Sequence, residues 1–399
     1  MRQGRGTSNF DLLRLVGATL VLVVHSFELT INRRAPITAI GEAVGEIAVV
    51  TFFVISGFLI TRSWAYDPKP LSFAIKRVLR LMPALLISLL LTALLLGPLT
   101  TTLPLSTYFA EPATKAYILS NATFQTFVQL PGVFAQTPFP NVVNQPLWTL
   151  PVEVKAYCVV AVLGLLGVVA LSGRRRLLVP AIALFFALLA IDSTRAAIPL
   201  GDRVVATIAD VQGPPEVVAI AHAGVLNELP RLVAAYMIGA SLFVLARWIP
   251  LRWSIAGALA VAWAVVAATI GPDAVPLATA LALPYVVVLL AYRTSHLVRL
   301  PRRMGDYSYG LYIFAFPIQQ AVILWLTPSS GLVTVAVAGS ITLALAVASW
   351  HFIEAPSLTL KQRIRQPLER EGAAAVAHPL ERIALQPDGP APVRGRGER

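Results

Sequence analysis

The chain is 399 residues long; 57% of its residues are hydrophobic and only 13% are charged. Soluble domains carry about 25% charged residues, so this composition, with a mean hydropathy of +0.73, excludes a soluble globular protein and indicates a polytopic membrane protein. The formal net charge of +12 could mark a nucleic-acid-binding protein, but basic loops on one side of a membrane produce the same excess.

Ten segments are apolar and long enough to cross a membrane as helices. In chain order they are 11–29, 43–62, 79–98, 147–171, 177–193, 230–247, 253–270, 275–292, 307–327 and 332–353. Residues 1–360 are therefore expected to form one all-α membrane domain with about ten transmembrane helices. Residues 361–399 are rich in Arg, Glu, Pro, Ala and Gly, which predicts a disordered cytoplasmic tail.

The basic residues predict the orientation. With the N-terminus inside, 24 of the 32 Lys and Arg residues fall in predicted cytoplasmic segments and five in outside loops. This asymmetry follows the positive-inside rule, so both termini are expected to be cytoplasmic, and the net charge needs no nucleic-acid partner. Two long outside loops, 98–146 and 194–229, could cover a site that opens to the outer face.

The first span, 11–29, contains ionisable residues, which are costly in lipid and therefore indicate function. Arg14 and His25 are eleven positions apart, or three turns plus about 20°, so they share one helix face about 16 Å apart. Asp11, three residues before Arg14, lies on that face and could hold its guanidinium. This one predicted helix thus carries a cation, Arg14, that Asp11 could hold near one membrane face, and a titratable base, His25, deeper in the membrane.

Two later spans begin with residues that could bind substrates. Arg77 and Arg80 lie at the cytoplasmic end of the third span, where they suit phosphate groups or form an ordinary positive-inside cluster. Glu153 begins the fourth span on the outer side; it could orient an imidazolium, bind hydroxyls or favour the positive helix N-terminus. Trp148 and Tyr157 fit stacking on a sugar and fit the interfacial aromatic belt equally well.

The remaining reactive residues give weaker signals. The single cysteine, Cys158, excludes a disulfide and a cysteine-based metal site within one chain, and no metal site is expected. His351 and Glu354 are three residues apart at the end of the last span and could pair with each other.

Six fragments, taken together and in order, carry a family resemblance. They are Arg14-x10-His25 preceded by Asp11, Phe52-Phe53-x2-Ser56-Gly57, Arg77-x2-Arg80, Trp148-Thr149-x3-Glu153-x3-Tyr157, the run 305–317 and the run 353–356. They resemble the acyltransferase 3 family of integral membrane acyltransferases, which O-acylate bacterial glycans and some small molecules. The resemblance covers roughly residues 8–360.

The resemblance implies transfer of an acyl group, acetyl by default, from cytoplasmic acyl-CoA to a hydroxyl of a carbohydrate or glycoconjugate. The reaction is expected at the outer face of the bacterial inner membrane, in contact with lipid, with acyl-CoA as a substrate and with no cofactor. His25 would be the general base for direct attack by the acceptor; a route in which the histidine itself is acylated stays open. Arg14 and Glu153 would also be catalytic. The expected substrate-binding residues are Asp11, Arg77, Arg80, Trp148, Tyr157 and Tyr312.

One departure and one rival interpretation stay open. Many family members carry a second histidine where this chain has Ala315. The role of that histidine is therefore either absent here or taken by a neighbour such as Tyr312 or Gln319. Intramembrane charges also suit a transporter or flippase that performs no acyl transfer, although no inverted repeat of broken helices is evident.

Overall fold

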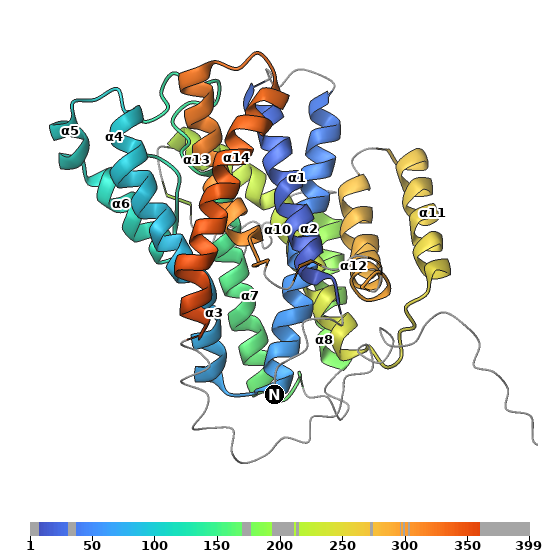
Figure 1. Ribbon diagram of the computed structural model, residues 1–399. Helices are drawn as coiled ribbons and strands as arrows, with labels where there is room; N and C mark the ends of the chain where they lie inside the picture. The colour runs from blue at the N-terminus through green and yellow to red at the C-terminus, as the bar shows by residue number, and fades with distance from the viewer. Residues whose placement is uncertain are drawn as a thin grey trace, which may run out of the picture.

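The computed structural model describes residues 8–30, 37–169, 177–193, 211–212, 215–271, 274–295, 297, 300–301 and 304–359. Helices make up most of this part of the chain (Figure 1). The elements are, in order, α1 (Phe10–Thr30), α2 (Ile37–Tyr66), α3 (Pro70–Leu91), the π-helix η1 (Thr92–Leu96), α4 (Gly97–Thr100), α5 (Leu105–Ala110), α6 (Pro112–Ala122), β1 (Thr126–Phe127), the 3-10 turn η2 (Gln145–Trp148), α7 (Thr149–Leu165), α8 (Leu178–Ser193), β2 (Val211–Gln212), α10 (Pro215–Val244), α11 (Trp253–Thr269), α12 (Val275–Arg293), α13 (Ser308–Leu326), α14 (Gly331–Ser349) and the π-helix η5 (Trp350–Glu354).

The described helices fit a membrane bundle. Seven of them are long and apolar enough to cross a membrane, and they contain α1, α2, α3, α7, α12, α13 and α14. Three shorter apolar helices, Leu178–Leu188, Leu229–Val244 and Trp253–Thr269, coincide with the remaining predicted spans. The all-α polytopic fold is therefore confirmed, whereas the number of ten crossings stays a prediction.

Close helix packing places α2 among α1, α7, α10 and α12. An added Cβ on Gly57 would lie 1.9 Å from the carbonyl oxygen of Tyr236, and one on Gly239 would lie 2.4 Å from that of Val54. Glycine is therefore required at both positions, because only a bare backbone lets α2 and α10 approach so closely. In Figure 1, α11 lies at the edge beside α12, and α5 and α6 project on the opposite side.

The segment before η2 is tied to α13 by hydrogen bonds. Pro317 lacks an N–H, so the carbonyl of Ile313 loses its usual partner one turn later in the helix. The Asn144 side-chain amide donates to that oxygen at 2.9 Å. The Gln320 side-chain amide of α13 donates to the carbonyl oxygens of Phe139 and Val142, which lie in the same segment as Asn144. A proline within α13 thus creates an acceptor that helps to anchor the segment before η2 to the bundle.

The predicted outer loops are more ordered than the sequence indicated. The interval 98–146 holds α5, α6, β1 and part of η2, and β1 pairs in parallel with β2. The predicted loop 194–229 is helical from Pro215 onward, because hydropathy marks only the apolar part of α10, whose first half contains Glu216 and Glu228. The rest of that loop, 194–210 and 213–214, and the predicted tail lie outside the described residues.

Candidate functional site

Four charged side chains from distant parts of the chain meet inside the bundle. Arg14 of α1 donates from Nη1 to Oδ2 of Asp306 at 2.8 Å, and Arg80 of α3 donates from Nη2 to the same oxygen at 2.5 Å. Arg80 also donates from Nη1 to Oε2 of Glu354 at 3.0 Å. Two cations therefore face two carboxylates, and this mutual compensation is what makes burial of the four charges tolerable.

Asp306 joins this cluster from the turn immediately before α13. Its Oδ1 accepts hydrogen bonds from the hydroxyl and the backbone N–H of Ser308, the first residue of that helix. Burial alone would raise the pKa of Asp306, but the guanidinium groups of Arg14 and Arg80 and the Ser308 hydrogen bonds outweigh burial and lower the pKa to about 2. The carboxylate is therefore ionised at any physiological pH.

Glu354 reaches the cluster because α14 ends in the π-helical turn η5. Its Oε1 accepts a hydrogen bond from the hydroxyl of Ser349 at 3.1 Å, and its Oε2 binds Arg80. The pairing of His351 with Glu354 expected from their spacing is wrong, because His351 lies 3.2 Å from the Tyr307 hydroxyl instead. π-turns of this kind often occur at functional sites.

The partner of Arg14 also differs from the expectation. The sequence offered Asp11, three residues earlier on the same helix face. In the structure, Asp306 accepts the hydrogen bond from Arg14, and the Asp11 side chain is exposed. Spacing along one helix reveals local neighbours only, and it carries no information on a carboxylate 292 positions away.

A cavity of about 160 Å³ opens beside this charge cluster. Arg14 and Arg80 line it together with residues of α2, α3, α7, α13 and the end of the described chain, namely Ile55, Ser56, Leu59, Ile60, Lys76, Arg77, Leu81, Glu153, Tyr157, Tyr309 and Leu358. We refer to it as the basic cavity, because four of its lining residues are Lys or Arg and one is acidic. Lys76 is paired with Asp67, so its charge is already compensated.

Arg77 differs from the other basic residues of this cavity, because within the described chain it forms no ion pair. Its Nε is buried and has no hydrogen-bond partner there. Its guanidinium carbon lies 5.8 Å from the ring centroids of both Phe73 and Tyr157, which are weaker cation–π contacts. A guanidinium held against aromatic rings, with no carboxylate in hydrogen-bond contact, is suited to an external anion.

Glu153 is the acidic residue of the basic cavity. Its Oε1 accepts hydrogen bonds from the hydroxyls of Ser56, at 2.8 Å, and of Tyr157. The expectation that Glu153 lies apart from Arg77, at the opposite end of the bundle, is wrong, because both residues line one cavity. The start of α7 is preceded by the buried turn η2, so Glu153 lies deeper in the bundle than hydropathy suggested.

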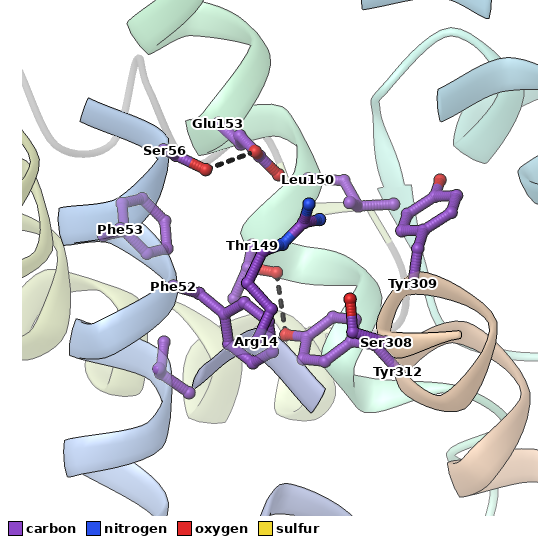
Figure 2. Close-up of a pocket in the computed structure, with 11 residues that line it drawn as sticks. Arg14, Phe52, Phe53, Ser56, Thr149, Leu150, Glu153, Ser308, Tyr309 and Tyr312 are labelled. Atoms are coloured by element: carbon purple, nitrogen blue, oxygen red, sulfur yellow. Dashed lines mark hydrogen bonds between the residues drawn. The ribbon is translucent and has the colours of Figure 1, made fainter. Parts of the chain in front are cut away.

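A second, smaller cavity of about 50 Å³ shares Arg14, Ser56, Glu153 and Tyr309 with the first and is otherwise mainly apolar (Figure 2). Its further lining residues are Val49, Phe52, Phe53, Thr149, Leu150, Ser308 and Tyr312. The Tyr312 hydroxyl lies 2.8 Å from that of Thr149. Figure 2 shows the Arg14 guanidinium pointing toward the Ser56–Glu153 pair, at the junction of the two cavities.

His25 lies in the C-terminal half of α1, apart from the residues that line these cavities. Because α1 is a continuous helix, the spacing of about 16 Å between Arg14 and His25 follows from its geometry. His25 Nδ1 lies 3.1 Å from Oε2 of Glu28, and its ring packs edge-on against Phe316. Glu28 was not among the predicted site residues, although its spacing of three residues from His25 places both on one helix face.

The structure thus brings together five of the predicted site residues in the basic cavity: Arg14, Arg77, Arg80, Glu153 and Tyr157. Tyr312 joins the second cavity, while Trp148 packs half-buried at the end of η2 and lines neither. Ala315 is buried against α1, and Gln319 donates to the Leu22 carbonyl and the Ser26 hydroxyl of that helix. Among the described residues, no group of three or more His, Cys, Asp or Glu side chains could hold a metal ion.

Comparison with known proteins gives a consistent result. A family model described as an acyltransferase domain matches residues 7–351. An O-acetyl transferase of Shigella phage Sf6 is 28% identical over 362 residues, which cover 88% of this chain and 96% of that protein. Nodulation protein 10 of Rhizobium leguminosarum bv. viciae is 28% identical over 392 residues, which cover 89% and 94%. No solved structure matches the chain.

Proposed function

The chain belongs to this acyltransferase family, and from that premise we propose that it transfers an acyl group, preferably acetyl, from cytoplasmic acyl-CoA to a hydroxyl of a carbohydrate or glycoconjugate at the outer face of a bacterial inner membrane. Acyl transfer follows from the family. The name of the phage relative supports the acetyl group. The donor, the acceptor and the side of the membrane are the proposal.

The observation that carries the donor assignment is the guanidinium of Arg77 in the basic cavity, which forms no ion pair within the described chain and whose Nε has no hydrogen-bond partner there. Phosphate oxygens of acyl-CoA would supply the hydrogen-bond acceptors that Arg77 lacks, and the planar guanidinium matches phosphate geometry. The cavity is smaller than acyl-CoA, so the nucleotide end would remain outside it at the cytoplasmic face. Arg80, already bound by two carboxylates, would contribute its charge and hold the wall of the cavity.

Arg14 would guide the acyl end of the donor. One of its nitrogens binds Asp306, and a guanidinium has five N–H donors, so others can face a carbonyl or phosphate oxygen in the adjoining cavities. Glu153 and Tyr157 share the basic cavity, so they too belong to the donor side in this proposal. Trp148, Tyr312 and Asp11 stay candidates for substrate contact outside it.

His25 would act as the general base for the acceptor. Its imidazole takes the proton from the acceptor hydroxyl while that oxygen attacks the thioester carbonyl carbon. The carbon–sulfur bond then breaks, the protonated imidazole returns the proton to the sulfur, and free CoA and the acyl ester leave. In the alternative route, the imidazole attacks the thioester first and the acceptor then displaces it from an acyl-histidine.

The test is incubation of membranes that contain the chain with acetyl-CoA labelled in the acetyl group. We expect label in cell-envelope glycans and a matching acyl mass by mass spectrometry, both absent from membranes without the chain. Label that stays on CoA in both membranes would overturn the proposal and favour a transporter or flippase. Soluble N-acetylated or free acetate products alone would exclude a glycan hydroxyl as the acceptor.

A further inference from the structure

His25 has a carboxylate partner on its own helix. Nδ1 of His25 lies 3.1 Å from Oε2 of Glu28, and each of the two side chains is 21% exposed. Residues three apart on a helix lie on one face, so the contact follows from the regular geometry of α1. The carboxylate therefore occupies one ring nitrogen and leaves Nε2 as the nitrogen available to a substrate.

The other side of the imidazole is held by packing. Phe316 of α13 meets the ring edge-on, with centroids 5.4 Å apart and an interplanar angle of 82°. Phe139, from the segment before η2, packs in turn against Phe316. Gln319 fixes α13 to α1 through two hydrogen bonds of 2.6 Å, so Phe316 cannot shift independently of His25.

Among the side chains that the structure describes, those of the neighbouring helices offer little competition for this histidine. In α13 the ionisable residues are tyrosines, and α14 contains none. In α2, Glu46 forms an ion pair with Arg231 of α10 at 3.4 Å. The charged residues of α3 are Lys76, Arg77 and Arg80, and all three line the basic cavity. Glu28 is therefore the carboxylate that, within the described part of the chain, is hydrogen-bonded to His25.

Building on the proposed function, we infer that Glu28 is the positioning residue of His25. It accepts a hydrogen bond from Nδ1–H, which fixes the tautomer with Nε2 unprotonated, and it stabilises the imidazolium formed during the reaction. The acceptor proton moves to Nε2 and then to the CoA sulfur, while the Nδ1 proton stays on the ring beside Glu28. A histidine oriented in this way by a carboxylate is an established device in hydrolases.

The test compares Glu28→Ala and Glu28→Gln with Glu111→Gln, which neutralises an exposed carboxylate on an outer segment. Each variant is purified, its thermal unfolding is measured, and acetyl transfer to native envelope membranes is followed over a range of acetyl-CoA concentrations. We expect both Glu28 variants to lose roughly 10- to 100-fold in kcat, part of the 10²–10⁴ that a general base contributes. KM for acetyl-CoA and the unfolding temperature should stay at wild-type values.

Two further variants distinguish this inference from the proposed function. In a His25→Ala background, Glu28→Gln should cause no additional loss, because the carboxylate acts only through the imidazole. If His25→Ala is inactive and both folded Glu28 variants keep kcat within twofold of wild type, the inference is overturned while the function stands. If His25→Ala itself retains wild-type activity, the proposed mechanism fails. If Glu28→Ala does not fold, the nearly isosteric Glu28→Gln decides.

Discussion

Arg14 and Asp306 are 292 positions apart in the sequence, and their side chains are joined by a hydrogen-bonded ion pair of 2.8 Å. This pair connects α1, which also carries His25, to the turn that begins α13, which carries Phe316. Arg80 of α3 also forms an ion pair with the Asp306 carboxylate, so a third helix is joined to the pair. The ion pair therefore ties the first turns of α1 to the start of α13. These two helices carry His25 and its packing partner Phe316 further along.

Asp306→Asn should destabilise the protein strongly, because it leaves Arg14 and Arg80 without the carboxylate that compensates both. Removing one partner of a buried ion pair typically costs about 3–5 kcal/mol. The measurement is thermal unfolding of the purified protein in detergent, with Asp67→Asn, which leaves the one cation Lys76 without its carboxylate, as a comparison. A change in Asp306→Asn no larger than that in Asp67→Asn would contradict the central role of this pair.

The lowered pKa of Asp306 predicts that the stability of the folded protein depends on pH. Because the folded-state pKa of Asp306 is lowered to about 2, its ionisation contributes stability that is fully present above the pKa of the unfolded chain, near 4. That contribution should fall as the pH drops from about 4 to about 2. Unfolding measured across this interval should show the decline in the wild-type protein and a smaller decline in Asp306→Asn. Equal slopes would show that Asp306 is not the group that titrates.

His25→Ala should abolish acyl transfer while membrane insertion and expression stay intact. A general base typically contributes 10²–10⁴-fold, so residual activity should be a hundredth of the wild-type rate or less. The assay is transfer of labelled acetyl from acetyl-CoA, normalised to the amount of folded protein. A rate above about a tenth of wild type would rule out general-base catalysis by His25.

Arg77→Gln should weaken donor binding without unfolding the protein, because Arg77 has no ion pair within the described chain to lose. Loss of one charge-assisted contact costs about 1.5–3 kcal/mol, so KM for acyl-CoA should rise roughly ten- to hundredfold. Arg80→Gln should reduce stability as well, since it removes both of its ion pairs. An unchanged acyl-CoA dependence in Arg77→Gln would mean that the basic cavity is not the donor site.

Cysteine labelling tests the orientation. In a Cys158→Ser background, cysteines at the exposed positions Ser106 and Gln136 should react with impermeant thiol reagents added outside intact cells. Cysteines at the exposed positions Arg252 and Pro301 should react only after the membrane is opened. The native Cys158 must be replaced because its side chain is also exposed. The reverse pattern would overturn the orientation deduced from the basic residues.

Hydropathy and motif order in the sequence were sufficient to predict the all-α membrane fold and the family. Long apolar segments must form helices in lipid, because backbone groups have no water to bond with there. The spacing of Arg14 and His25 also followed directly, since a helix converts eleven positions into a fixed rise. The first half of α10 was missed because its polar residues hide it from a hydropathy measure.

Tertiary structure alone decided how the charges are shared. Asp306 and Glu354 each meet Arg80 only because α3, the turn before α13 and the π-turn after α14 converge, and no local spacing encodes that convergence. The depth of Glu153 likewise depended on η2, which carries the start of α7 into the bundle beside Arg77. Local periodicity determines which residues share a helix face, whereas the packing of helices determines which charge compensates which and leaves Arg77 without an ion pair in the described chain.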